Sequence, residues 1–175
     1  TLLRLYSDLY TIRRLYVLWA GDILDGTTAY RGQRYRLQLH TPEAQRHWAL
    51  GRVCRFMEEL ASEVPETVGL VCAGNHARIG TSDDVPASED SELRLFTDVA
   101  RDTVGVPNLT WERHRLGVSF VAQPTGNVVY MEHGQRVPWG GKTSQPTPST
   151  WTHAYQRCMD EGRIAEVVCW GHRHT

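Results

Sequence analysis

Four short polar motifs in this chain contain the side chains that most often bind divalent metals in proteins. Their sequences are GDILDG at 21–26, GNH at 74–76, HG at 133–134 and GHRH at 171–174. Carboxylate, amide and imidazole groups of this kind can converge on one or two cations. A metal held in this way activates water and stabilises the transition state of phosphoryl transfer. The residue types therefore predict a hydrolytic metal site, provided that the fold brings the motifs together.

Each motif follows an apolar run that is typical of a buried strand. The runs are VLWA, VGLVCA, NVVYM and VVCW, which end at residues 20, 73, 131 and 170. Strands buried on both faces of a parallel sheet are continuously apolar, and ligands gather outside their carboxyl ends. A glycine in each motif lets the backbone turn sharply. We therefore expect the motifs to meet at one edge of an α/β structure.

The remaining pattern predicts the elements that position the motifs. Apolar residues at helical spacing predict helices at 2–12, 41–62, 91–103 and 151–162, the second with Thr41 as its N-cap. Short strands are expected at 15–20, 68–73, 109–112, 118–122, 128–131 and 166–170, and loops at 27–41, 80–90 and 138–150. Helices and strands alternate early and strands cluster later. This order favours one α/β domain over 1–175, with two packed sheets and helices on the outer faces.

The order GD-x-x-DG, GNH, HG and GHxH resembles the calcineurin-like metallophosphoesterase superfamily, including its DNA-repair exonuclease branch, over residues 15–175. The resemblance implies an α/β sandwich of two mixed sheets that hydrolyses a phosphate ester. It also implies divalent metal cofactors in a dinuclear site. Imidazole, carboxylate and amide ligands favour Mn²⁺, with Fe or Zn²⁺ as alternatives.

The same resemblance implies a role for individual residues. Asp22 is expected to bridge two metals, while Asp25 orders its loop by accepting backbone hydrogen bonds. His76 is expected to be the general acid that protonates the leaving oxygen. One metal would be bound by Asp22, Asn75, His133 and His172, and the other by Asp22 and His174.

Two features depart from the family pattern. The family's D-x-H motif has only one candidate, SDLY at 7–10, in which Tyr10 stands in place of His. The few residues between Tyr10 and the strand at 15–20 are too short for a parallel crossover. We therefore expect helix 2–12 to be the crossover itself and the D-x-H motif to be absent. We also expect a catalytic core that is trimmed at both ends and that binds one metal well. Ala77 stands where an acidic residue usually follows GNH, which leaves the tuning of His76 unexplained.

A basic and aromatic segment follows the first motif. Arg31 and Arg34 alternate with Tyr30 and Tyr35, a pattern that can bind phosphate and stack bases, or form a solvated loop. Arg78 is a further candidate phosphate contact. We expect a nuclease-type phosphodiesterase acting on nucleic acid, with a small phosphodiester or a phosphoprotein as alternative substrates. A non-catalytic scaffold that binds a partner is the alternative function.

The composition is that of an ordinary globular domain, with 41% apolar residues and a net charge of -1. Any anion binding must therefore be local. No apolar run reaches the roughly 20 residues that span a bilayer, and no secretory signal is evident. We expect a cytoplasmic protein whose four cysteines are reduced, because none forms a C-x-x-C pair: Cys54, Cys72, Cys158 and Cys169. Four histidines match no ligand pattern and are expected on the surface or in loops: His40, His47, His114 and His153.

Overall fold

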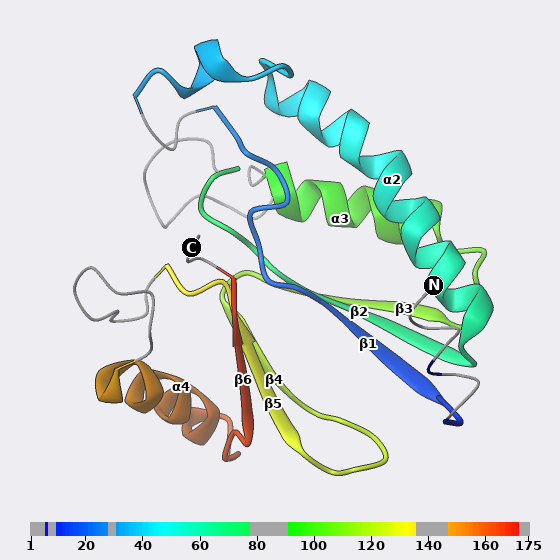
Figure 1. Ribbon diagram of the computed structural model, residues 1–175, viewed down its shortest axis with the longest axis vertical. Helices are drawn as coiled ribbons and strands as arrows, with labels where there is room; N and C mark the ends of the chain where they lie inside the picture. Colours follow the sequence, from blue (N-terminus) through cyan, green and yellow to red (C-terminus); the bar gives the residue numbers. More distant parts are fainter. Residues whose placement is uncertain (1–5, 7–9, 28–30, 78–90, 136–146, 172–175) are drawn as a thin grey trace.

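The computed structural model describes residues 6, 10–27, 31–77, 91–135 and 147–171. Within them the chain forms two three-stranded sheets with helices packed against them (Figure 1). The first sheet has the order β1 (Arg14–Trp19), β2 (Glu66–Cys72) and β3 (Leu109–His114), and both pairings are parallel. All three strands of this sheet therefore end at the same edge.

The second sheet is mixed. Its central strand, β5 (Val128–Glu132), pairs antiparallel with β4 (Gly117–Val121) and parallel with β6 (Val167–Trp170). A tight connection joins β4 to β5, in which the Ala122 N–H donates to the Asn127 carbonyl at 2.8 Å. The carboxyl ends of β5 and β6 point toward the edge at which β1 and β2 end (Figure 1).

Three α-helices are described, α2 (Pro42–Glu63), α3 (Ser91–Asp102) and α4 (Pro148–Asp160), and a 3₁₀-helix, η1 (Gln33–Arg36), precedes α2. Helix α2 begins after Thr41, whose hydroxyl oxygen accepts a hydrogen bond from the Ala44 N–H at 3.1 Å. This cap satisfies one of the amide groups that the first turn leaves without a partner. Helices α2 and α3 cover one face of the first sheet, and α4 lies against the second sheet (Figure 1).

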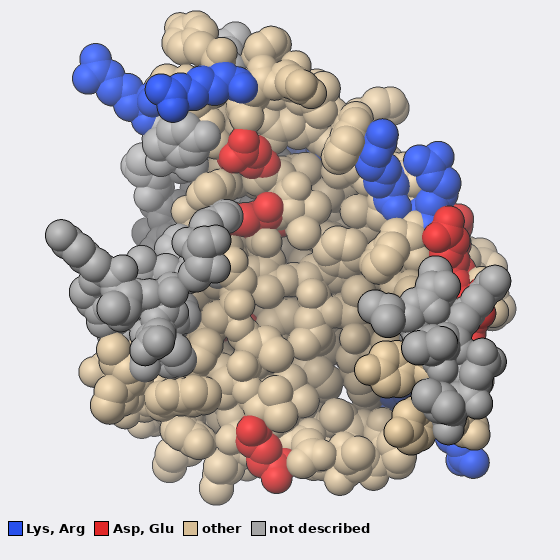
Figure 2. Space-filling model, viewed as in Figure 1, with Lys and Arg blue, Asp and Glu red and all other residues tan. Residues whose placement is uncertain are grey.

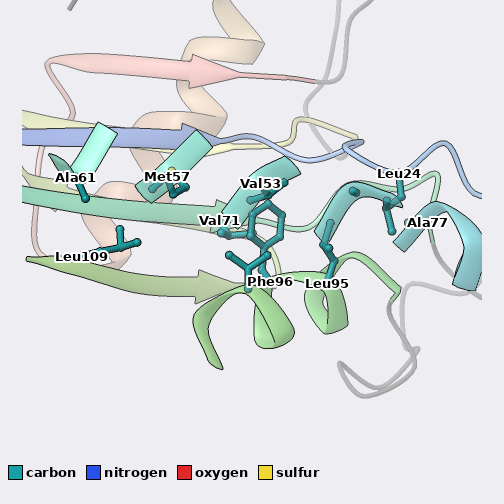
Figure 3. Packing of buried hydrophobic residues seen from close by; sticks show 11 residues of the cluster. Leu24, Val53, Met57, Ala61, Val71, Ala77, Leu95, Phe96 and Leu109 are labelled. Carbon is teal, nitrogen blue, oxygen red and sulfur yellow. The ribbon is translucent and has the colours of Figure 1, made fainter. Parts of the chain in front are cut away.

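Alternate residues of β2 face two different cores, as the twofold period of a strand requires. Val71 packs with Met57 of α2 and Phe96 of α3 on one face (Figure 3). Leu70 packs against Met131 of the second sheet on the other face. A third cluster joins α4 to β5 and includes Tyr130, Ala154 and Cys158. The layers are therefore helices, sheet, sheet and helix, which confirms the predicted α/β class.

The predicted strands and the helices at 41–62 and 91–103 are confirmed, with bounds that differ by two residues or fewer. The predicted start of the last helix at 151 is wrong, because α4 begins at Pro148. Thr147 is its N-cap and forms a capping box with Thr150. The Pro- and Thr-rich stretch that we interpreted as loop therefore contains the signal for a helix start.

Several predicted segments lie outside the described residues, namely most of helix 2–12, the loop at 80–90 and most of the loop at 138–150. At the edge of the first of these, the Tyr10 N–H donates to the Tyr6 carbonyl at 2.8 Å, a helix-type bond. Among the described residues, no helix has the length and apolar character that a membrane crossing requires.

Candidate metal centre

The segments that follow β1, β2 and β5 lie in contact at one edge of the molecule. His133, just after β5, links the two sheets, because its Nδ1 lies 2.7 Å from the Ala20 carbonyl oxygen after β1. The Gly171 N–H, at the end of β6, donates to the His133 carbonyl at 3.1 Å. The structure thus brings Asp22, Asn75 and His133 together from three segments that are far apart in sequence.

Three potential metal ligands converge at this edge. The His133 Nε2 lies 2.8 Å from the Asn75 Oδ1 and 3.1 Å from the Asp22 Oδ2. The Ala20 carbonyl can only accept a hydrogen bond, so the His133 Nδ1 carries a proton and Nε2 is the atom that can bind a cation. The Asp22 Oδ2 is buried and has no aligned hydrogen-bond donor, although the ring of His133 lies close. A buried carboxylate oxygen in this condition is costly unless a cation neutralises it.

The other carboxylate oxygen of Asp22 is fully occupied. Its Oδ1 accepts hydrogen bonds from the N–H groups of Asn75 at 2.9 Å and His76 at 3.0 Å. Asp22 itself has a positive φ of 58°, which is rare for a residue other than glycine and costs about 1–3 kcal/mol. A Cβ atom on Gly74 would overlap both the amide nitrogen and the carboxylate of Asp22, so this close approach requires glycine. The strained backbone therefore aims the carboxylate at the Asn75 loop.

The electrostatic surroundings keep this pair of side chains charged. Burial raises the pKa of Asp22, but the contact with His133 and the N–H of His76 outweigh it and lower the pKa to about 2. Burial lowers the pKa of His133, but the Asp22 carboxylate and the Ala20 carbonyl outweigh it, so the pKa lies above 6.5. In the metal-free protein, the two side chains therefore form an ion pair.

His76 lies between two carboxylates. Its Nε2 is 3.7 Å from the Asp22 Oδ2, and its Nδ1 is 3.6 Å from the Asp25 Oδ1. The acidic neighbour that is missing at Ala77 is thus replaced in space by Asp25, a residue of the first motif. The side chain of His76 is 23% exposed, so a substrate can reach it. Asp25 also accepts a hydrogen bond from the side chain of Gln33 at 3.1 Å, whereas we predicted backbone donors.

Glu92, in the first turn of α3, holds the Asp22 and Gly74 segments in place, and sequence reasoning missed it. Its side chain is fully buried and accepts hydrogen bonds from the N–H groups of Gly74 at 2.7 Å, Ile23 at 2.6 Å and Asp22 at 3.2 Å. An acidic residue in a first helical turn is common, so the sequence contained no signal that separated Glu92 from an ordinary exposed residue.

Two buried glutamines fix the rest of the first motif. Gln45 of α2 donates to the Gly26 carbonyl at 3.0 Å and accepts from the Gly26 N–H at 2.9 Å, and it also donates to the Leu39 carbonyl. Gln33 of η1 donates to the Asp25 carbonyl at 2.6 Å. A polar residue at a helical core position, such as Gln45, was the available signal, and we did not use it. These contacts place the Asp25 side chain beside His76.

A hollow of about 400 Å³ opens beside the first motif. It lies between residues 23–25, the segment 36–39 and the first turns of α2, and Trp48 and Leu37 form part of its apolar wall. Asp25 lines this hollow and also faces His76. The hollow is therefore open on the side of His76 at which Asp25 lies.

The structure gives different amounts of information on the other predicted site residues. Arg31 is described and exposed, and arginine side chains gather over η1 at one margin of the molecule (Figure 2). Of Arg34, the structure describes only the backbone within η1. Arg78, His172 and His174 lie outside the described residues.

His153, which we predicted on the surface or in a loop, lies within a helix and has a partly buried side chain. It lies on α4, and its Nε2 is 2.9 Å from the Glu132 Oε2. The buried Glu132 also accepts a hydrogen bond from the Tyr130 hydroxyl at 2.7 Å, and burial together with this carboxylate raises the pKa of Tyr130 above its ordinary value. This network anchors α4 directly behind His133.

No protein-family model, curated protein or solved structure matches the chain. Among the residues that the structure describes, no three or more His, Cys, Asp and Glu side chains form a group that could hold a metal. The described ligand set is instead one carboxylate, one imidazole and one amide oxygen.

Proposed function

We propose that this chain is a metal-dependent phosphoesterase of the calcineurin-like metallophosphoesterase type, with nucleic acid as the favoured substrate. One observation supports it above all. The Asp22 Oδ2, the Asn75 Oδ1 and the His133 Nε2 converge, and the buried Oδ2 has no aligned donor. A divalent cation satisfies all three atoms at once, whereas an imidazolium proton can satisfy only one of the two oxygens well.

The chemistry of the three ligands fits such a cation. A metal-binding histidine usually donates its second ring N–H to a carbonyl or carboxylate, and the His133 Nδ1 lies 2.7 Å from the Ala20 oxygen. Carboxylate, amide and imidazole ligands suit Mn²⁺, Fe or Zn²⁺, and Mn²⁺ is the ion that we favour. His172 and His174 complete the ligand set in this proposal. When bound, the metal polarises the phosphate and activates water.

The residues of the chain supply positioning and proton transfer. His76, next to the ligand Asn75, donates a proton to the leaving oxygen, which is the role of a general acid. Asp25, 3.6 Å from the His76 Nδ1, holds the imidazole so that Nε2 points toward the centre. Glu92 fixes the backbone of Asp22 and Gly74, so the ligands are in place before substrate binds. Preorganisation of this kind lowers the cost of reaching the transition state.

The arrangement of the motifs also supports the family proposal. They follow β1, β2, β5 and β6, two strands from each sheet. The order of layers, with helices outside two sheets, supports the proposal of a metallophosphoesterase-type sandwich.

The proposal is tested by metal content and hydrolysis. We would measure the metal content by elemental analysis after Mn²⁺ loading, and the rate of hydrolysis of bis(p-nitrophenyl) phosphate. Both are measured on the wild type and on Asp22→Asn. Asp160→Asn, a change at an exposed helical aspartate, is the matched control. We expect bound Mn²⁺ and turnover in the wild type and the control, and loss of both in Asp22→Asn. Absence of turnover in the wild type would contradict the proposal and favour a non-catalytic scaffold.

A further inference from the structure

A second hollow, of about 650 Å³, lies among α2, α3 and the end of β3. We call it the arginine groove, because its walls include Arg46, Arg94, Arg113 and Arg115, together with Thr97 and Asp98. The two sequence-predicted arginines, Arg31 and Arg34, do not line it. None of its four arginines stood out in the sequence, since they come from three different elements.

The arginine groove has a strong excess of positive charge. Asp98 is the one acidic residue in its described lining, and it is shared between Arg46 and Arg101, whose Nη1 lies 3.0 Å from it. Arg113 donates to the Thr97 hydroxyl at 2.8 Å and, among the described residues, pairs with no carboxylate. Arg94 likewise has no described carboxylate partner. On a chain with a net charge of -1, the described lining of the groove is therefore locally basic, with four arginines and one aspartate.

The arginine groove and the candidate metal centre are built on hydrogen-bonded neighbouring segments. Arg94 lies two positions after Glu92 on α3, and Glu92 accepts hydrogen bonds from the N–H groups of Asp22 and Gly74. On the other wall, the His114 carbonyl, between Arg113 and Arg115, accepts from the Ala73 N–H at 3.1 Å. Both walls are therefore fixed to the segments that contain the metal ligands, at the same carboxyl edge of the first sheet.

The chemistry of the groove selects a phosphate backbone. Planar guanidinium groups form paired hydrogen bonds with phosphate oxygens, and they remain charged at any physiological pH. The described lining contains no aromatic ring on which a base could stack. Contacts to phosphate alone give affinity without reading sequence. The ligand that fits is a nucleic-acid strand with several phosphates.

We propose that the arginine groove binds the phosphate backbone of a nucleic-acid strand and leads the neighbouring phosphodiester to the Asp22–His133 centre. The assignment as a substrate groove rests on the proposed function. Binding by the groove itself does not, because it needs neither metal nor turnover.

The test is the salt dependence of binding, measured by fluorescence anisotropy with a short labelled single-stranded oligonucleotide and metal-free protein. Each phosphate contact on a single strand contributes about 0.7 to the slope of log K against log salt. Changing Arg94→Ala with Arg113→Ala should therefore lower the slope by about 1.4 and weaken binding by at least about tenfold. Arg94→Lys with Arg113→Lys keeps the charges and should preserve the slope. This second variant separates lost contacts from lost folding.

Arg52→Ala with Arg55→Ala, on α2 outside the groove, removes the same charge and is the matched control. An equal fall in slope in this control would overturn the proposal, because it would show a general charge effect. A fall in Arg31→Ala with Arg34→Ala, without a fall in the groove variant, would overturn it by placing the strand on the η1 segment. Equally tight, groove-dependent binding of polyglutamate would overturn the nucleic-acid assignment.

A separate measurement distinguishes this proposal from the proposed function. The wild type is assayed with Mn²⁺ and bis(p-nitrophenyl) phosphate. Turnover of this small ester without groove-dependent slope changes would overturn the groove and leave the phosphoesterase intact. Groove-dependent binding without turnover would support the groove as a nucleic-acid site and contradict the phosphoesterase.

Discussion

Two carboxylates at the carboxyl edge of the first sheet, those of Glu92 and Asp22, have very different surroundings. Glu92 is fully buried, and both of its oxygens accept backbone N–H groups. Asp22 has one oxygen with two N–H donors and one buried oxygen without an aligned donor. A carboxylate whose two oxygens both accept N–H groups stabilises the fold, whereas in the proposed function the second oxygen of Asp22 is a cation ligand. The comparison separates the residue that builds the site from the residue that is proposed to act in it.

The largest effect is expected for Asp22→Asn on hydrolysis. Metal polarisation of phosphate is worth several kcal/mol, so turnover of bis(p-nitrophenyl) phosphate should fall by on the order of 10³-fold. The metal-free protein should lose only the ion pair with His133, about 2 kcal/mol, because the amide oxygen can still accept the Asn75 and His76 N–H groups. Steady-state kinetics and calorimetry measure the two quantities. A loss of metal-free stability as large as that expected for Glu92→Gln would show that Asp22 and Glu92 have the same structural role.

The reverse pattern is expected for Glu92→Gln. The amide places a donor against buried N–H groups and removes charge-assisted hydrogen bonds, which should lower the free energy of unfolding by about 4 kcal/mol. The corresponding fall in melting temperature is about 10 °C for a chain of this size. Glu43→Gln, at an exposed acidic residue in the first turn of α2, is the matched control and should have almost no effect. A Glu92 variant as stable as this control would contradict the structural role.

A third buried polar residue, Gln45, tests whether a side chain with all its hydrogen bonds made affects stability without affecting metal binding. Gln45→Leu leaves the Gly26 N–H and the Gly26 and Leu39 carbonyls without their partner and should cost about 3 kcal/mol. Mn²⁺ affinity, measured by titration calorimetry, should change less than in Asp22→Asn, because Gln45 contacts none of the three ligands. Equal losses of metal affinity would show that the two roles are not separable.

The smallest effect is the pH dependence of metal-free stability. Asp22 has a pKa lowered from 3.8 to about 2, so its contribution is present above pH 3.8 and is lost as the pH falls toward 2. His133 has a raised pKa, so its contribution is present below pH 6.5 and is lost as the pH rises through the raised value. Together they should amount to about 2 kcal/mol between these limits. Denaturant unfolding measures it, and the dependence should disappear in Asp22→Asn.

Sequence reasoning succeeded where local pattern decides structure. The apolar run before Gly21 is a strand because buried strands are continuously apolar, and Thr41 begins α2 because its hydroxyl caps the first turn. It failed at Pro148, where a helix start was interpreted as loop. It also placed Asp22 and Asn75 after strands of one parallel sheet, whose neighbouring ends share an edge. His133 follows β5 of the second sheet and reaches them only because the two sheets pack together.

The sequence by itself determined the positions of the described strands and of α2 and α3, the order of the four motifs and the chemical types of the candidate ligands. Only the tertiary structure decided that Glu92 and Gln45 hold the motif loops, that Asp25 stands in for an acid after His76, and that four distant arginines form one groove. The physical reason is that hydrophobic period and capping act within a few residues, whereas buried hydrogen bonds and charge clusters join residues that are far apart in sequence.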